Sequence, residues 1–107
     1  MHTRISSLVS HLVTLTTLAT LAACSSTPDR NSALDQARSR YNAAQNDAQV
    51  ATLAPEELKR AAESLRMADK ALADGGTVAS VDHLAYMTGQ RVTIAQETAS
   101  SKAAQTA

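Results

Sequence analysis

Aromatic residues and cysteine are almost absent from this sequence. Its 107 residues include no tryptophan, no phenylalanine and one cysteine, and Tyr41 and Tyr86 are its only tyrosines. A core built on large rings is therefore excluded, and so is a disulfide bond within one chain. The folded part must be stabilised by the packing of small aliphatic side chains, of which alanine is the commonest.

The sequence also lacks an excess of positive or negative charge. Ten Lys and Arg residues balance ten Asp and Glu residues, so the formal net charge at pH 7 is zero. Proteins that bind nucleic acid need a basic surface that neutralises phosphates. We therefore expect no nucleic-acid partner.

A long apolar run is lacking too, although the first residues approach one. Arg4 and the amino terminus give a positive start, and residues 5–21 follow as an apolar segment diluted by Ser, Thr and His11. A transmembrane helix needs about 20 predominantly apolar residues. A positive start before a weaker apolar segment is instead typical of a signal peptide that is removed after export. We expect this signal peptide over residues 1–23.

The end of the signal segment carries the most informative motif, the lipobox Leu21-Ala22-Ala23-Cys24. Its small side chains let the extended backbone enter a lipoprotein signal peptidase, and the cysteine thiol accepts the diacylglyceryl group. Each buried CH₂ of acyl chains such as palmitate contributes about 0.8 kcal/mol to membrane binding. The motif predicts a lipid-anchored protein whose mature chain begins at Cys24. The alternative is a buried cysteine near an uncleaved anchor.

The residues after the lipobox indicate where the anchor lies. In bacterial lipoproteins generally, Asp directly after the lipidated cysteine favours retention in the inner membrane, and here Ser25 occupies that place. This resemblance implies an outer-membrane protein that faces the periplasm of the cell envelope. Residues 24–31 include Pro28 and several Ser, Thr and Asp residues, as in a short linker.

The remaining sequence predicts an all-α domain over residues 32–100. Apolar residues recur at steps of three and four, as in the stripes of a coiled coil or helical bundle. We expect a first helix over about 32–48, a connection over 46–54, and a second helix that begins at Pro55. The fold is a small three-helix up-down-up bundle, or a long helical hairpin with a shorter first helix. Residues 101–107 are expected to form a disordered tail.

The second and third helices have clear boundary signals. Pro55 suits the first position of a helix, and Glu56 and Glu57 suit its positive end. Gly75 and Gly76 then favour a helix stop, because glycine adopts the left-handed conformation at little cost. A third helix is expected from Thr77 to about Ser100.

This third helix has a wider apolar arc than one stripe requires. The arc either packs between the first two helices or faces a partner, and both possibilities stay open. Arg91 beside it is either solvated or a contact for a carboxylate or phosphate. The candidate interaction face comprises Leu84, Met87, Arg91 and Ile94.

One set of residues spread over most of residues 32–99 forms a recognisable pattern. It comprises Ala33-Leu34, Ala37-Arg38, Tyr41, Ala54-Pro55-Glu56-Glu57-Leu58, Ala61, Leu65, Ala68, Ala71-Leu72, Gly75, His83-Leu84-Ala85-Tyr86, Gln90-Arg91 and Ile94-Ala95. With this pattern the mature sequence resembles a family of bacterial lipoproteins that carry an Ala-rich helical domain of unknown function, often followed by an OmpA-like peptidoglycan-binding domain. No OmpA-like domain follows Ala107, so direct peptidoglycan binding is not expected. The resemblance implies no catalytic residues.

These observations favour a structural or scaffolding lipoprotein that associates with itself or with an envelope protein. After removal of the signal peptide, His83 is the only histidine, and lipid blocks Cys24. No set of metal ligands or nucleophile with its base can be assembled from one such chain. We therefore expect no metal, no cofactor and no enzymatic activity. The alternative is a small module that binds a lipid or peptide ligand in a groove between the second and third helices.

Overall fold

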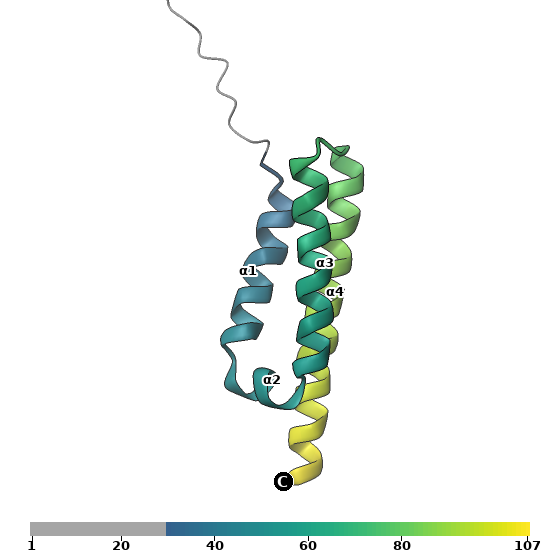
Figure 1. The fold of residues 1–107 in the computed structure, drawn as a ribbon. Coiled ribbons are helices and arrows are strands. Elements are labelled where there is room, and N and C mark those ends of the chain that lie inside the picture. Colours follow the sequence, from purple (N-terminus) through teal and green to yellow (C-terminus); the bar gives the residue numbers. More distant parts are fainter. Residues whose placement is uncertain (1–29) are drawn as a thin grey trace, which may run out of the picture.

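Four helices make up the part of the chain that the structure, a computed structural model, describes, residues 30–107. They are α1 (Ser32–Asn46), α2 (Ala48–Leu53), α3 (Pro55–Ala73) and α4 (Val78–Thr106), with no strand among these residues. The three longer helices lie side by side in alternating directions, and α2 closes one end of the bundle (Figure 1). The predicted all-α fold, a long hairpin with a shorter first helix beside it, is confirmed.

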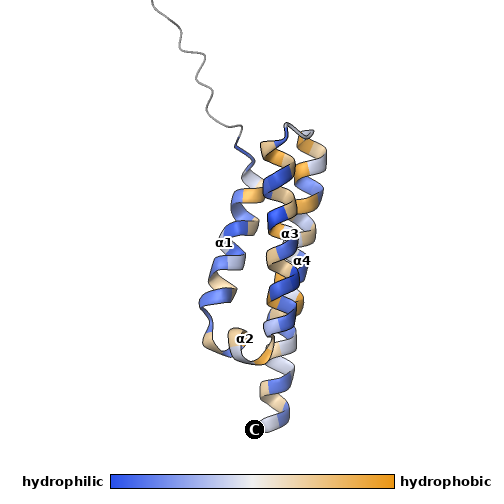
Figure 2. Ribbon diagram, viewed as in Figure 1, coloured by the Kyte–Doolittle hydropathy of each residue, from blue (hydrophilic) through white to orange (hydrophobic). Residues whose placement is uncertain are grey.

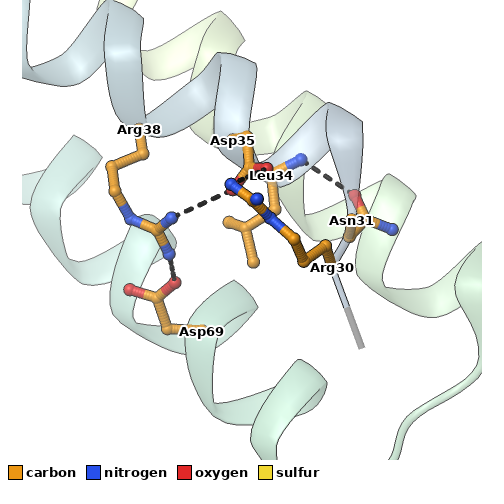
Figure 3. Close-up of polar contacts among 6 residues, drawn as sticks. All are labelled: Arg30, Asn31, Leu34, Asp35, Arg38 and Asp69. Atoms are coloured by element: carbon orange, nitrogen blue, oxygen red, sulfur yellow. Dashed lines mark hydrogen bonds and ion pairs between the residues drawn. The ribbon is translucent and has the colours of Figure 1, made fainter. Parts of the chain in front are cut away.

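Helix α1 begins at a cap that also joins it to α4. The Oδ1 atom of Asn31 accepts a hydrogen bond from the Leu34 backbone N–H at 2.8 Å, which satisfies one free donor of the first turn (Figure 3). The Nδ2 atom of Asn31 donates to Asp82 Oδ1, also at 2.8 Å. Asn31 is only 7% exposed, so the folded domain begins at a fixed point.

An arginine joins α1 to α3. The guanidinium of Arg38 donates to Asp35, one turn earlier on α1, at 3.2 Å, and to Asp69 on α3 (Figure 3). All three side chains are about half exposed, so solvent screens the pairs and each contributes at most about 1 kcal/mol. These contacts therefore define how α1 is aligned along α3 and add little to the stability of the fold.

Helix α2 was not expected, because residues 46–54 show no apolar period. Asp47 initiates it: the Asp47 carboxylate accepts hydrogen bonds from the backbone N–H groups of Gln49 at 2.9 Å and Val50 at 3.4 Å. The predicted connection is therefore a six-residue helix flanked by two non-helical residues, Asp47 and Ala54. A helix this short buries one residue, Val50, so it leaves no repeating pattern in the sequence.

The turn between α3 and α4 is built on the predicted glycines. Gly75 has φ = +75°, and its N–H donates to the Leu72 carbonyl, while the N–H of Gly76 donates to the Ala71 carbonyl at 2.8 Å. This pair of bonds is a Schellman motif. Thr77 then caps α4 through its hydroxyl, which accepts from the Ser80 N–H at 3.1 Å.

Helix α4 continues through the predicted disordered tail, so that prediction was wrong for residues 101–106. The segment has no glycine or proline to stop the helix, and Ala103 and Ala104 favour its continuation. The Nζ atom of Lys102 also donates to the Leu53 carbonyl at 2.9 Å, which ties this part of α4 to the end of α2.

Two clusters of buried side chains form the core. One, near the α3–α4 turn, contains Leu34, Leu65 and Val81, and the other, near α2, contains Val50, Leu58 and Val92. Alanine supplies eight of the fourteen buried apolar residues, so the helices approach closely but bury little area per residue. Figure 2 shows apolar and polar residues interspersed along every helix, as expected for helices that bury one face and expose the other.

Tyr41 contacts both clusters from α1. It is half-buried, and among residues 30–107 it is the one partly buried side chain that packs against both of them. The two halves of the core are thus joined by one of the two tyrosines, the only aromatic residues of the sequence.

Candidate functional site

The predicted interaction face lies on α4, and the structure divides it. Leu84 is half-buried and packs against the cluster near the α3–α4 turn, so it belongs partly to the core. Met87 and Ile94 are exposed, by 36% and 51%. Of the predicted face, Met87, Arg91 and Ile94 therefore remain at the surface, and Arg91 and Ile94 lie where α4 borders α3.

Arg91 is the unusual member of this face. Its side chain is half-buried, and its Nε atom is buried without a hydrogen-bond partner among residues 30–107. Arg91 also takes part in none of the ion pairs formed among these residues. Leaving a buried donor unsatisfied costs about 1–3 kcal/mol, so the free chain carries a donor that a suitable acceptor would satisfy.

A small hollow lies beside Arg91 on the seam between α3 and α4. Its volume is about 50 Å³, and it is lined by Glu57, Arg60, Arg91 and Ile94. This space holds a water molecule or the end of one side chain, but not a lipid or peptide, since ligand pockets usually measure about 300–1,000 Å³. Two guanidinium groups and one carboxylate give the hollow a positive balance.

The sequence pattern did not identify the α3 residues that line this hollow. Glu57 and Arg60 meet Ile94 and Arg91 because α3 and α4 are antiparallel, and this register places Met67 level with Leu84. Met67 is 53% exposed. The tight Gly75-Gly76 turn is the signal that could have given this register, since it sets which turns of the two helices face each other.

A larger hollow lies between α1 and α4. Its volume is about 240 Å³, and Gln36, Arg40, Tyr86 and Gln90 are among its lining residues. Arg40 crosses over the buried Gly89 and donates to Thr93 Oγ1 at 2.7 Å. Tyr86 is 62% exposed. This hollow beside α1 is thus larger than the one on the seam between α3 and α4, where the sequence led us to look for a groove.

Other chemistry is sparse among the described residues. No group of three or more His, Cys, Asp or Glu side chains within residues 30–107 is placed to hold a metal ion. His83 lies exposed on α4. None of the helices in this part of the chain is both long and apolar enough to cross a membrane. Cys24 and the other lipobox residues, Leu21, Ala22 and Ala23, lie outside the described residues.

Comparison with known proteins identifies the helical domain. No curated protein and no solved structure matches the chain. One family model, described as a domain of unknown function (DUF4398), matches residues 32–107. This range begins at the first residue of α1 and includes the last turns of α4, so the matched unit is the bundle itself. The chain belongs to the DUF4398 family of domains of unknown function.

Proposed function

We propose that this protein is a lipid-anchored scaffold of the bacterial cell envelope, without catalytic activity, that docks a protein partner on the seam between α3 and α4. The anchor is the acylated Cys24, in the outer membrane and facing the periplasm. The docking face comprises Arg60 and Met67 of α3 with Met87, Arg91 and Ile94 of α4.

The order of signals in the sequence supports the anchor. A positive start, an apolar segment and the lipobox come before a polar linker, and the helical domain begins directly after that linker, at Asn31. A targeting segment is expected to lie outside the folded unit that it delivers. The family match, which starts at residue 32, leaves the lipobox and linker outside the family domain.

The observation that carries the docking face is the unsatisfied Nε of Arg91. Arg91 lines the hollow together with Arg60 and Ile94, and Met87 precedes it by one turn of α4; Met87 and Ile94 are both exposed. A partner carboxylate placed in the hollow would accept from Arg91 while apolar partner groups cover its neighbours. Charge-assisted hydrogen bonds of this kind are about twice as strong as neutral ones. The partner is therefore a protein surface with a carboxylate among apolar side chains.

The alternative function is a module that binds a lipid or peptide ligand. The groove between α1 and α4 supports it, because Tyr86 and two amide side chains lie around about 240 Å³ of open space. The small hollow on the α3–α4 seam, about 50 Å³, favours the scaffold instead. A monomer that binds hydrophobic probes would support the ligand module.

Photo-crosslinking in cells tests the docking face. A photoreactive residue replaces Met87 or Ile94, and the membrane-bound adducts are identified by mass. We expect one discrete adduct, either with a second copy of the chain or with one envelope protein, and the mass distinguishes these two. Gln90, exposed on the same helix but on the groove side, is the matched control position. Equal labelling at all three positions, or none at Met87 and Ile94, contradicts the proposal.

The anchor has its own test. We expect the mass of the mature N-terminal peptide to show acylation of Cys24, and Cys24→Ser to release the chain from the membrane fraction. A chain that keeps an unmodified Cys24, or stays membrane-bound after the substitution, contradicts the anchor without affecting the docking face.

A further inference from the structure

The chain enters the bundle at the same end as the α3–α4 turn (Figure 1). Arg30 and Asn31 line a hollow of about 330 Å³ together with Gly75, Gly76 and Val78. Figure 1 places the carboxyl end of α4 at the opposite end of the bundle. Any tether attached before Arg30 therefore leaves from the turn end.

Asn31 holds this arrangement in place. Its side chain caps α1 through Leu34 and at the same time donates to Asp82, one turn into α4. Fraying of α1 would break the first contact and leave Asp82 without its donor. The point where the tether begins is thus coupled to α4, the longest helix, and not only to the first turn of α1.

The tether is short compared with the bundle. Six residues lie between Cys24 and Asn31, and the seven steps from one to the other, at about 3.4 Å each, reach at most about 24 Å. Helix α4 has 29 residues, which correspond to a length of about 43 Å. The turn end consequently stays near any membrane that holds Cys24, whereas the other end of α4 can lie far from it.

The turn end also offers an apolar contact. Val78 is 72% exposed, the largest exposed fraction among the large apolar residues of the described chain. The Arg30 side chain beside the same hollow is 86% exposed, and its guanidinium lies 3.8 Å from Asp35. An exposed valine next to a solvated arginine suits the boundary between lipid headgroups and acyl chains.

We infer that the α3–α4 turn is the membrane-facing end of the molecule: the bundle stands on the lipid surface with Val78 at the headgroups and α4 pointing away. This inference rests on the proposed anchor at Cys24. Arg91 lies thirteen residues after Val78, so the docking face is held about 20 Å above the bilayer. Its partner is thus reached above the headgroup layer and not within it.

The absence of tryptophan makes the orientation measurable. The single variants Val78→Trp and Ala104→Trp place a unique fluorophore at exposed sites near the two ends of α4. The lipidated chain is reconstituted in vesicles of phosphatidylethanolamine and phosphatidylglycerol that contain a headgroup nitroxide lipid. We expect at least twofold quenching at position 78 and none at position 104. Matching circular dichroism melts of both variants and the parent chain verify the fold.

Each other result overturns the inference. Equal quenching at both positions means that the bundle lies flat, stronger quenching at position 104 means that it is inverted, and no quenching means that it stands off the surface. The mass of the Cys24 peptide is measured first, so failure of the anchor is seen separately. If Cys24 is not acylated, a maleimide-functionalised phosphatidylethanolamine is coupled to this only cysteine, and the same comparison decides the orientation.

Discussion

Single residues of this bundle differ in whether their polar atoms are satisfied. The buried side chains of Asn31 and Thr88 both make hydrogen bonds, whereas the buried Nε of Arg91 makes none among the described residues. The unsatisfied Nε of Arg91 costs stability in the free chain, while the half-buried residue lines the hollow between α3 and α4. Function and stability oppose each other at such a residue.

Arg91→Met removes the unsatisfied donor and keeps a long side chain. We expect the free energy of unfolding to stay the same or to rise by about 1 kcal/mol, and the crosslinked adduct from Ile94 to decrease. Urea denaturation and crosslinking yield measure the two effects. Arg66→Met, an exposed arginine elsewhere on α3, is the control and should change neither. Destabilisation of Arg91→Met by more than about 1 kcal/mol would show that the side chain stabilises the monomer.

Gly89 lies buried within α4. A glycine within a helix is often associated with close approach of another backbone, but a Cβ atom at this position would meet only the guanidinium of Arg40, at 2.7 Å from Nη1. The end of an arginine side chain can move aside. Periodicity cannot distinguish these cases, because it does not tell which atoms of a neighbouring helix cross the glycine.

Gly89→Ala should therefore be tolerated. The substitution loses the exposed bond from Arg40 to Thr93 and gains about 1 kcal/mol of helix propensity. We expect the unfolding free energy to change by about 0 to +1 kcal/mol, measured by urea denaturation. In the Arg40→Ala background the gain should approach the full amount. A loss in both backgrounds would mean that a backbone contact requires the glycine after all.

At the scale of elements, the sequence predicted what its strong signals define. Pro55, the two glycines and Thr77 mark helix ends, and the structure places the ends of α3 and the start of α4 at these residues. Helix α2 depends on one capping carboxylate, Asp47, and the last turns of α4 depend partly on the contact from Lys102 to Leu53. Neither a single local cap nor one contact between distant residues leaves a periodic signal.

The α3–α4 turn gives a prediction for the two glycines that do matter. Gly75→Ala places a Cβ on a residue at φ = +75°, which costs about 1–2 kcal/mol. Gly76→Ala places one 2.8 Å from the Ala71 carbonyl oxygen, a backbone atom that cannot easily move. We expect both variants to melt at a lower temperature than the parent chain. Gly89→Ala, measured alongside them, controls for general effects of replacing glycine.

At the scale of the whole molecule, Tyr41 and Tyr86 form a natural comparison. Tyr41 packs against both core clusters, whereas Tyr86 is 62% exposed. We expect Tyr41→Ala to lower the unfolding free energy by about 2–3 kcal/mol, somewhat less than for a fully buried ring, and Tyr86→Ala to change it by less than about 0.5 kcal/mol. Urea denaturation followed by circular dichroism measures both. Equal losses would mean that the two clusters do not depend on Tyr41 for their connection.

The candidate site was predictable only in part, because contacts between helices leave no signal in the pattern of a single helix. Met87, Arg91 and Ile94 follow from the width of the apolar arc on one helix. Arg60 of α3 lines the same hollow as Arg91 and Ile94, and the exposed Met67 lies two turns after Arg60. Their place beside α4 depends on a register that the sequence pattern of α3 alone does not define.

The cap at Asn31 has a mechanical consequence. In an anchored chain, a pull between the membrane and a partner on the seam enters the bundle at this residue. Asn31 is bonded to α1 through Leu34 and to α4 through Asp82, so the force divides between two helices at the first folded residue. While the bond to Asp82 holds, α4 carries part of the load. Once it breaks, tension acts on the end of α1 alone and peels this helix away turn by turn, with the α3–α4 hairpin left intact as the element that still bears the partner.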